Sequence, residues 1–173
     1  MKPETKQQVA EAFRNFRLPR YNEIPNVGLY LEQTTKYICE YLAPLQENAL
    51  TSSMISNYVK KDLISNPVKK LYSRDQIAYL FFIAVAKSVL SLDALIGFIK
   101  VQQRTYTLPK AYDYFCDELE NLLQFTFELK DTIEIMGEDN TDEKRLLYTC
   151  IVAAVQKVYL EKCLKVIADN EEA

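Results

Sequence analysis

Apolar and polar positions alternate over residues 51–62 with the period of an α-helix. Ile55, Tyr58 and Val59 fall on one face, which can pack against a core. The opposite face carries polar residues at i, i+3, i+4 and i+7: Ser53, Ser56, Asn57 and Lys60. Hydroxyl, amide and ammonium groups suit phosphates and base edges. The pattern predicts a helix with one core-facing side and one side for a polar, negatively charged partner.

The residues before this helix predict a second helix and a turn. An apolar stripe over residues 29–43 ends at Pro44, which cannot continue a helix. Residues 44–50 then form the turn, and Thr51 can cap the helix that follows by accepting an unpaired backbone N–H. The order of elements is therefore that of a helix-turn-helix.

A basic turn and two capped helices are predicted next. Residues 66–72 contain Pro67 and two lysines, which indicates an extended wing. Ser73 and Gln76 have the spacing of a capping box, and the helix that they open is apolar nearly all round. Ser91 can cap one more helix.

Both ends of the chain also show helical patterns. An apolar stripe predicts a first helix over residues 4–17, and the ordered loop after it holds Arg20, either a phosphate ligand or a solvated side chain. A last helix is expected from 142 to 168, with two apolar stripes, and a loop at Gly137 precedes it. Spacings of three and four indicate a coiled-coil seam or helical hairpin before that loop: Tyr112, Phe115, Leu119, Leu122, Thr126, Leu129, Ile133 and Met136.

These patterns predict an all-α fold, with at most a minimal β wing, because long segments pass without Gly or Pro. We divide the chain into an N-terminal helix and loop at 1–28, a helix-turn-helix domain at 29–105 and a helical hairpin at 106–173. The hairpin either packs within the chain or joins two copies, and the pattern leaves both open.

Composition excludes several kinds of chemistry. The chain has no His, so Ser-His-Asp catalysis and His-ligated zinc are unavailable, and its three glycines form no phosphate-binding loop. We therefore expect no enzyme, no metal and no cofactor. The four cysteines lack a C-x-x-C pair and are expected to be buried thiols in a reducing compartment.

Location and charge complete the picture. Residues 1–20 are charged throughout and the apolar run from Ile77 stops at Lys87, so we expect a cytoplasmic protein outside the membrane. Residues 51–110 carry nine basic and three acidic side chains, a net +6, whereas 111–173 carry six and fifteen, a net −9. A basic middle beside an acidic tail is typical of a binding module attached to another part.

The segments SSMISNYVKKDLI, KKLYSRDQIAYL and SVLSLDALI, in this order, resemble the DNA-binding domain of MerR-type regulators. The resemblance implies that Ser53, Asn57 and Tyr58 lie on a recognition helix, and that Lys70 and Tyr72 meet phosphates from a wing. MerR-type proteins also dimerise through later helices. The chain departs from the family at Ser56-Asn57, where the family has Arg-Tyr, and at Asp62, where it has Gly.

More broadly, residues 18–100 are similar to an uncharacterised bacterial family known only as a domain of unknown function, which implies no activity. Our first hypothesis is a cytoplasmic transcriptional regulator that binds double-stranded DNA as a dimer. The expected contacts come from the helix at 51–62 and the wing: Ser53, Ser56, Asn57, Tyr58, Lys60, Lys61, Lys69, Lys70, Tyr72 and Arg74.

Two alternatives stay open. The first is a protein-interaction module that kept the helix-turn-helix scaffold without DNA binding. Ser56 in place of the family's Arg and the acidic tail both favour it. The second is a small-molecule-binding helical protein or enzyme, with an effector pocket lined by Tyr106, Tyr112, Tyr148 or Tyr159. Such tyrosines are more often core residues with a solvated hydroxyl. The sequence names neither an operator nor an effector.

Overall fold

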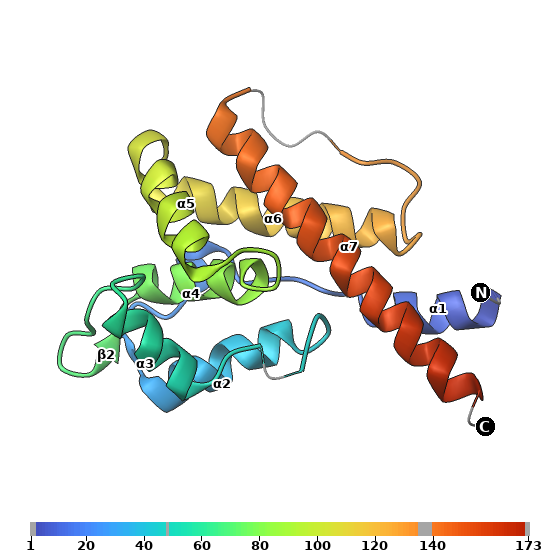
Figure 1. Cartoon of the computed structure of the whole chain (residues 1–173), viewed down its shortest axis with the longest axis horizontal. Helices are drawn as coiled ribbons and strands as arrows, with labels where there is room; N and C mark the ends of the chain where they lie inside the picture. The colour runs from blue at the N-terminus through green and yellow to red at the C-terminus, as the bar shows by residue number, and fades with distance from the viewer. Residues whose placement is uncertain (1–2, 48, 135–139, 172–173) are drawn as a thin grey trace.

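The computed structural model describes residues 3–47, 49–134 and 140–171 of the 173-residue chain. The fold is all-helical with one small two-stranded sheet, as the sequence predicts (Figure 1). The elements are α1 (Pro3–Glu11), a 3-10 turn (Tyr21–Glu23), β1 (Leu29–Tyr30), α2 (Leu31–Leu42), α3 (Ser52–Lys60), β2 (Leu71–Tyr72), α4 (Arg74–Ala86), α5 (Leu92–Thr105), α6 (Leu108–Thr126) and α7 (Asp142–Glu171).

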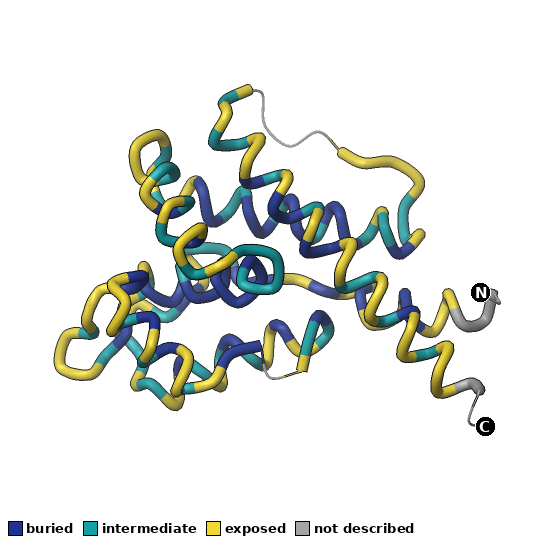
Figure 2. The backbone as a smooth tube through the Cα atoms, in the orientation of Figure 1, coloured by how far each residue is buried: buried dark blue, intermediate teal, exposed yellow. Residues whose placement is uncertain are grey.

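Helix α4 is the centre of the core. Its predicted capping box is confirmed: the Gln76 N–H donates to Ser73 Oγ at 3.3 Å, and the Ser73 N–H donates to Gln76 Oε1 at 2.8 Å. Every residue from Gln76 to Ala86 except Tyr79 is buried, which Figure 2 shows as a dark-blue helix inside the molecule. Helices α2, α6 and α7 pack around it, so the three segments expected from the sequence share one core.

The sheet joins the start of α2 to the start of α4. Strands β1 and β2 are antiparallel, with Leu29 opposite Tyr72 and Tyr30 opposite Leu71. Gly28 precedes β1 at a φ of 77°, and a Cβ there would lie 3.1 Å from Leu71 Cβ. Glycine at this position therefore allows β2 to approach and avoids the strain of a left-handed backbone.

The expected helix over residues 4–17 is shorter in the structure, because α1 ends at Glu11. Phe13 and Phe16 follow in turns and enter the core. The Phe13 ring stacks on Phe127 with the ring centroids 4.2 Å apart. Burial of this pair outweighs the local preference for helix.

The expected seam through residue 136 is also wrong beyond Thr126, where α6 ends. The Leu129 N–H donates to the Gln124 carbonyl and the Glu128 N–H to the Phe125 carbonyl, with Glu128 at a φ of 57°. This is a Schellman helix end. Ile133 lies in an exposed segment after it, and Met136 and Gly137 lie outside the described residues. The predicted C-terminal helix is confirmed as α7.

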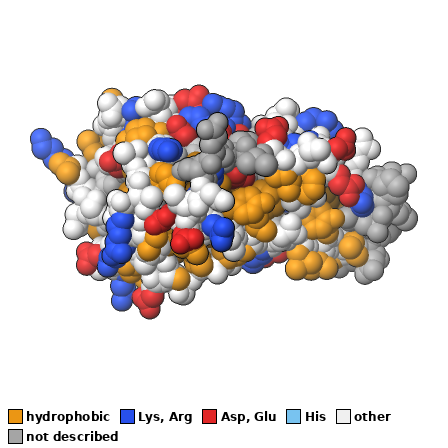
Figure 3. Space-filling view, turned by 90° about the horizontal axis from the view of Figure 1, so that it is seen from above, with side chains coloured by type: hydrophobic (Ala, Val, Ile, Leu, Met, Phe, Trp, Pro, Cys, Tyr) orange, Lys and Arg blue, Asp and Glu red, His pale blue; other side chains and the backbone are white. Residues whose placement is uncertain are grey.

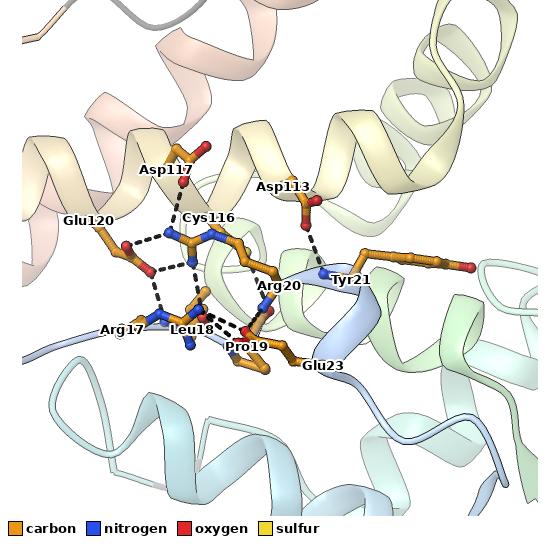
Figure 4. A network of polar contacts seen from close by, with 10 residues as sticks. All are labelled: Arg17, Leu18, Pro19, Arg20, Tyr21, Glu23, Asp113, Cys116, Asp117 and Glu120. Carbon is orange, nitrogen blue, oxygen red and sulfur yellow. Dashed lines mark hydrogen bonds and ion pairs between the residues drawn. The ribbon is translucent and has the colours of Figure 1, made fainter.

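A cluster of ion pairs ties the N-terminal loop to α6 (Figure 4). The Arg20 guanidinium donates to both oxygens of Glu120 at 2.7 Å and pairs with Asp117 at 2.8 Å. The same Glu120 accepts the Leu18 N–H at 2.8 Å, and Asp113 accepts the Tyr21 N–H at 2.7 Å. We call Arg20, Asp113, Asp117 and Glu120 the Arg20 latch. Arg20 is thus held half-buried against α6.

The cysteines and the helix lengths bear on the expected compartment. The four cysteines are free thiols; Cys116, Cys150 and Cys163 are buried, and Cys39 is half-buried. Burial raises the pKa of Cys150 to about 11, so its thiolate is scarce near neutral pH. None of the helices in the described ranges has the length and apolar character needed to cross a membrane.

The latch predicts unequal effects of two arginine substitutions. Arg20→Met leaves two acidic side chains without their cation, so the free energy of unfolding should fall by about 2–3 kcal/mol. Arg17→Met is the control, because Arg17 pairs with Glu23 at the exposed surface and such pairs contribute about 0–1 kcal/mol. Urea denaturation followed by circular dichroism measures both. Equal losses for the two variants would contradict the structural role of the latch.

Candidate nucleic-acid interface

Helix α3 is anchored on one side and open on the other. Thr51 Oγ1 accepts the Met54 N–H at 3.2 Å, which confirms the predicted N-cap. Ile55 is fully buried, and α3 packs against α2 through this side. On the opposite side Ser53, Asn57 and Lys60 are exposed. Because the apolar side is fixed in the core, the polar side has a defined direction.

The end of α3 is a Schellman motif. The Leu63 N–H donates to the Tyr58 carbonyl at 3.0 Å and the Asp62 N–H to the Val59 carbonyl at 3.1 Å. Asp62 has a φ of 56°, a left-handed conformation that Gly adopts without cost. The motif turns Leu63 into the core and leaves Lys60 and Lys61 exposed at the last turn.

The predicted wing is a tight hairpin whose tip is two lysines. Val68 bridges Leu71, and the Leu71 N–H donates to the Val68 carbonyl at 2.9 Å. Between them Lys69 and Lys70 have φ values of 51° and 67°, and both side chains are exposed. Two consecutive positive φ values are the mark of a type I′ turn, in which Asn-Gly is the preferred pair. Lysines here carry a conformational cost of about 1–2 kcal/mol per residue.

Three of the ten expected contact residues also have internal roles. The rings of Tyr58 and Tyr72 are buried, and burial raises the pKa of both hydroxyls. Arg74 is half-buried: its Nε donates to the Ile24 carbonyl at 2.9 Å, and its guanidinium carbon lies 5.5 Å from the centroid of the Tyr21 ring. These three side chains thus have contacts within the protein, and their expected contact with DNA stays a prediction.

The seven remaining residues form two groups at one end of the molecule, where Figure 1 shows α3 beside the wing. Five come from α3 and its last turn, and two from the wing. Ser56 is half-buried and the others are exposed. We call the whole set the α3–wing surface: Ser53, Ser56, Asn57, Lys60, Lys61, Lys69 and Lys70.

A cleft with mixed polar and apolar walls borders this surface, and sequence reasoning missed it. It has a volume of about 530 Å³ and lies between the end of α3, the start of α4 and α5. Its wall includes the carboxylates of Asp62 and Asp75 and the ammonium group of Lys100. Two carboxylates against one ammonium make the cleft unsuited to phosphate, so it marks a boundary of any DNA-facing area.

The distribution of charge is mixed outside this surface. Figure 3 shows basic and acidic side chains interspersed on the face seen from above. Within the described ranges, no group of three or more metal-ligating side chains is close enough to hold an ion. The local chemistry that remains is that of hydroxyl, amide and ammonium donors.

The fold is that of a small, mainly helical protein with one two-stranded sheet, in which the polar side of α3 is exposed. The chain belongs to the DUF1836 family, described as a domain of unknown function, whose family model matches residues 19–115. That match runs from the Arg20 loop into α6 and covers more than half of the chain. No curated protein and no solved structure was found to match.

The wing turn predicts a stabilising double substitution. Lys69→Asn combined with Lys70→Gly places the preferred residues in a type I′ turn, so the free energy of unfolding should rise by about 1 kcal/mol. The control is Lys60→Asn with Lys61→Gly, which removes the same charges from right-handed positions and should destabilise α3 by about 1 kcal/mol. Thermal unfolding compares the variants. A loss of stability for the wing variant would contradict the assigned turn.

Proposed function

We propose that the protein is a cytoplasmic DNA-binding transcriptional regulator that inserts α3 into the major groove and places the wing lysines on the phosphate backbone. The observation that carries the proposal is the α3–wing surface: a capped, core-anchored helix with an open polar side, beside a turn that holds two lysines at a conformational cost.

The geometry assigns different tasks to the two groups. Helix α3 has nine residues and is about 13 Å long, which suits the groove of B-DNA. Asn57 can bind adenine through both atoms of its amide, and Ser53 can donate to either type of base edge. The lysines Lys61, Lys69 and Lys70 supply positive charge for phosphates, which positions the helix without reading sequence.

The resemblance to MerR-type regulators supports this assignment at one backbone position. The family has Gly after its recognition helix, and here Asp62 adopts the left-handed conformation that Gly favours. The direction of the chain from the helix into the wing is thus compatible with the family pattern. The departure at Ser56-Asn57 removes an arginine that would meet phosphate, so the proposed phosphate contacts depend on the lysines of α3 and the wing.

DNA binding should depend steeply on salt, and the wing should contribute to that dependence. Anisotropy titrations on genomic fragments give the slope of log Kobs against log salt. In the variant Lys69→Asn with Lys70→Gly, this slope should flatten by about 0.9 for each phosphate that the wing no longer neutralises. Because this variant is expected to be more stable than the wild type, unfolding would not explain the change.

A second pair of variants tests whether α3 recognises the base sequence. Asn57→Ala should reduce the difference in binding free energy between the best fragment and the other fragments by about 1–3 kcal/mol, with little change in the slope of log Kobs against log salt. Ser65→Ala, outside the α3–wing surface, should change neither quantity. Absence of binding to every genomic fragment at low salt would refute the proposal.

We further propose that the regulator is a dimer joined through α7. Leu160, Leu164 and Ile167 recur at i, i+4 and i+7 on one face of α7, and each is at least 40 % exposed. Figure 3 shows hydrophobic side chains gathered in the half of the molecule where α1 and the second half of α7 lie. Specific binding by helix-turn-helix proteins generally uses two recognition helices one helical turn apart, which a dimer supplies.

The dimer has its own test. Leu160→Ser with Leu164→Ser should convert the protein to a monomer in light scattering, because it removes two apolar side chains from each copy of the interface. Val27→Ser, an 83 % exposed apolar residue elsewhere, is the control and should leave the mass unchanged. A wild-type protein that stays monomeric across micromolar concentrations would refute the dimer.

The alternative of a protein-interaction module uses the same α7 face for a different protein. The two functions differ in their dependence on the wing. An interaction module would lose its partner on substitution of Leu160 and Leu164 and keep it on substitution of Lys69 and Lys70, with no DNA binding in either case.

A further inference from the structure

Helix α5 covers an apolar cavity at the side of the molecule remote from the α7 stripe. The cavity has a volume of about 100 Å³. Its apolar walls come from Phe98 and Val101 on α5, Ala111 on α6, and Leu146 and Leu147 on α7. The consecutive helices α5 and α6 and the later helix α7 thus line one space.

A smaller cavity of about 30 Å³ continues the first one inward. The two share Phe98, Ala111 and Leu147 as lining residues, and the inner one reaches Ala78 and Phe82 on α4. Protein interiors are normally close-packed, so a space of this size beside the core is unusual. Apolar cavities of comparable size stay dry and accept small apolar molecules.

The wall also carries polar and charged residues, namely Gln102, Tyr106, Lys110, Tyr114, Glu143 and Lys144. Two of them have hydrogen bonds that position them within the protein. Gln102 accepts from the Tyr79 hydroxyl at 3.3 Å and donates to the Tyr106 carbonyl at 2.8 Å. The Tyr106 hydroxyl lies 2.6 Å from Thr141 Oγ1. These bonds already satisfy the Gln102 amide and the Tyr106 phenol. The inner cavity is also lined by Tyr112, whose buried hydroxyl has no hydrogen-bond partner among the described residues.

Two rings define the shape of the space. Phe98 and Phe82 lie with centroids 5.1 Å apart and ring planes at 31°, and both line the inner cavity. A planar ring entering beside Phe98 would extend this near-parallel pair, which is a favoured aromatic arrangement.

We propose that this cavity is a binding site for a neutral molecule with a single aromatic ring. The site is distinct from the α3–wing surface and needs no DNA for its occupation. The ligand bridges α5 to α6 and α7 and replaces the missing packing between them. Of the four tyrosines considered from the sequence for such a pocket, Tyr106 lines the outer cavity and Tyr112 the inner one; Tyr148 and Tyr159 line neither.

The test is a titration of the full chain with toluene and with indole, followed by methyl NMR spectra. We expect saturable shift changes at the methyl groups of Val101, Leu146 and Leu147, and a higher Tm at saturation because ligand binds only the folded state. Cyclohexanol, which is compact but not aromatic, should bind more weakly by about tenfold if the ring contact with Phe98 matters.

Two substitutions fill the cavity from different sides. Ala111→Leu and Val101→Phe should each weaken toluene binding by about tenfold or more, because the added side chain occupies the site. Ala94→Leu, on the exposed side of α5, is the matched control and should bind as the wild type does. Since Val101 is half-buried, its variant keeps the test decisive where Ala111→Leu fails to fold. Absence of saturable shifts up to the solubility of both probes, or unchanged affinity in a folded cavity-filling variant, would overturn the proposal.

Discussion

The contact between Arg20 and α6 sets the relation between the two ends of the molecule. Arg20 binds Glu120 through two hydrogen bonds and pairs with Asp117, while the backbone of its loop donates to Glu120 and Asp113. The same loop receives Arg74 at the Ile24 carbonyl. Because Arg74 is the first residue of α4, the loop links the start of α4, next to the wing, to the C-terminal helices. A bidentate, charge-assisted contact gives this link a defined geometry.

Helix α4 connects the Arg20 latch to the α3–wing surface. It is buried along nearly its whole length, and α2, α6 and α7 pack against it. Helices α6 and α7 also pack against each other. The Ser73 cap follows β2 directly, and β2 pairs with β1 at the start of α2. Helix α3 then packs on α2 through Ile55. The exposed side of α3 is therefore oriented by a chain of rigid contacts that begins at the latch.

The helix caps could be predicted from the sequence, whereas contacts between residues far apart in the chain could not. The N-caps of three helices could be predicted, because a cap involves only residues within one turn: Thr51, Ser73 and Ser91. Arg20 and Glu120 are 100 residues apart, and no periodicity relates them. The end of α6 follows from the stacking of Phe127 on Phe13, also a distant contact. In the candidate site, the helical period of the sequence was enough to predict the exposure of Ser53, Asn57 and Lys60. Tyr58 and Tyr72 were assigned to the DNA-facing surface by resemblance, and their rings are buried in the core.

The residues other than Gly that have a positive φ differ in whether contacts within the protein compensate their strained backbone. Glu128 ends α6 in this conformation and is compensated by its ion pair with Lys6 at 2.6 Å and by the burial of Phe127 beside it. Asp62 is compensated by a Schellman end that buries Leu63. Lys69 and Lys70 adopt the same conformation, yet within the described part of the chain their side chains make no ion pair or hydrogen bond. No contact among the described residues therefore offsets the backbone strain of two lysines at a turn that favours Asn-Gly, and the proposed negatively charged partner would account for them.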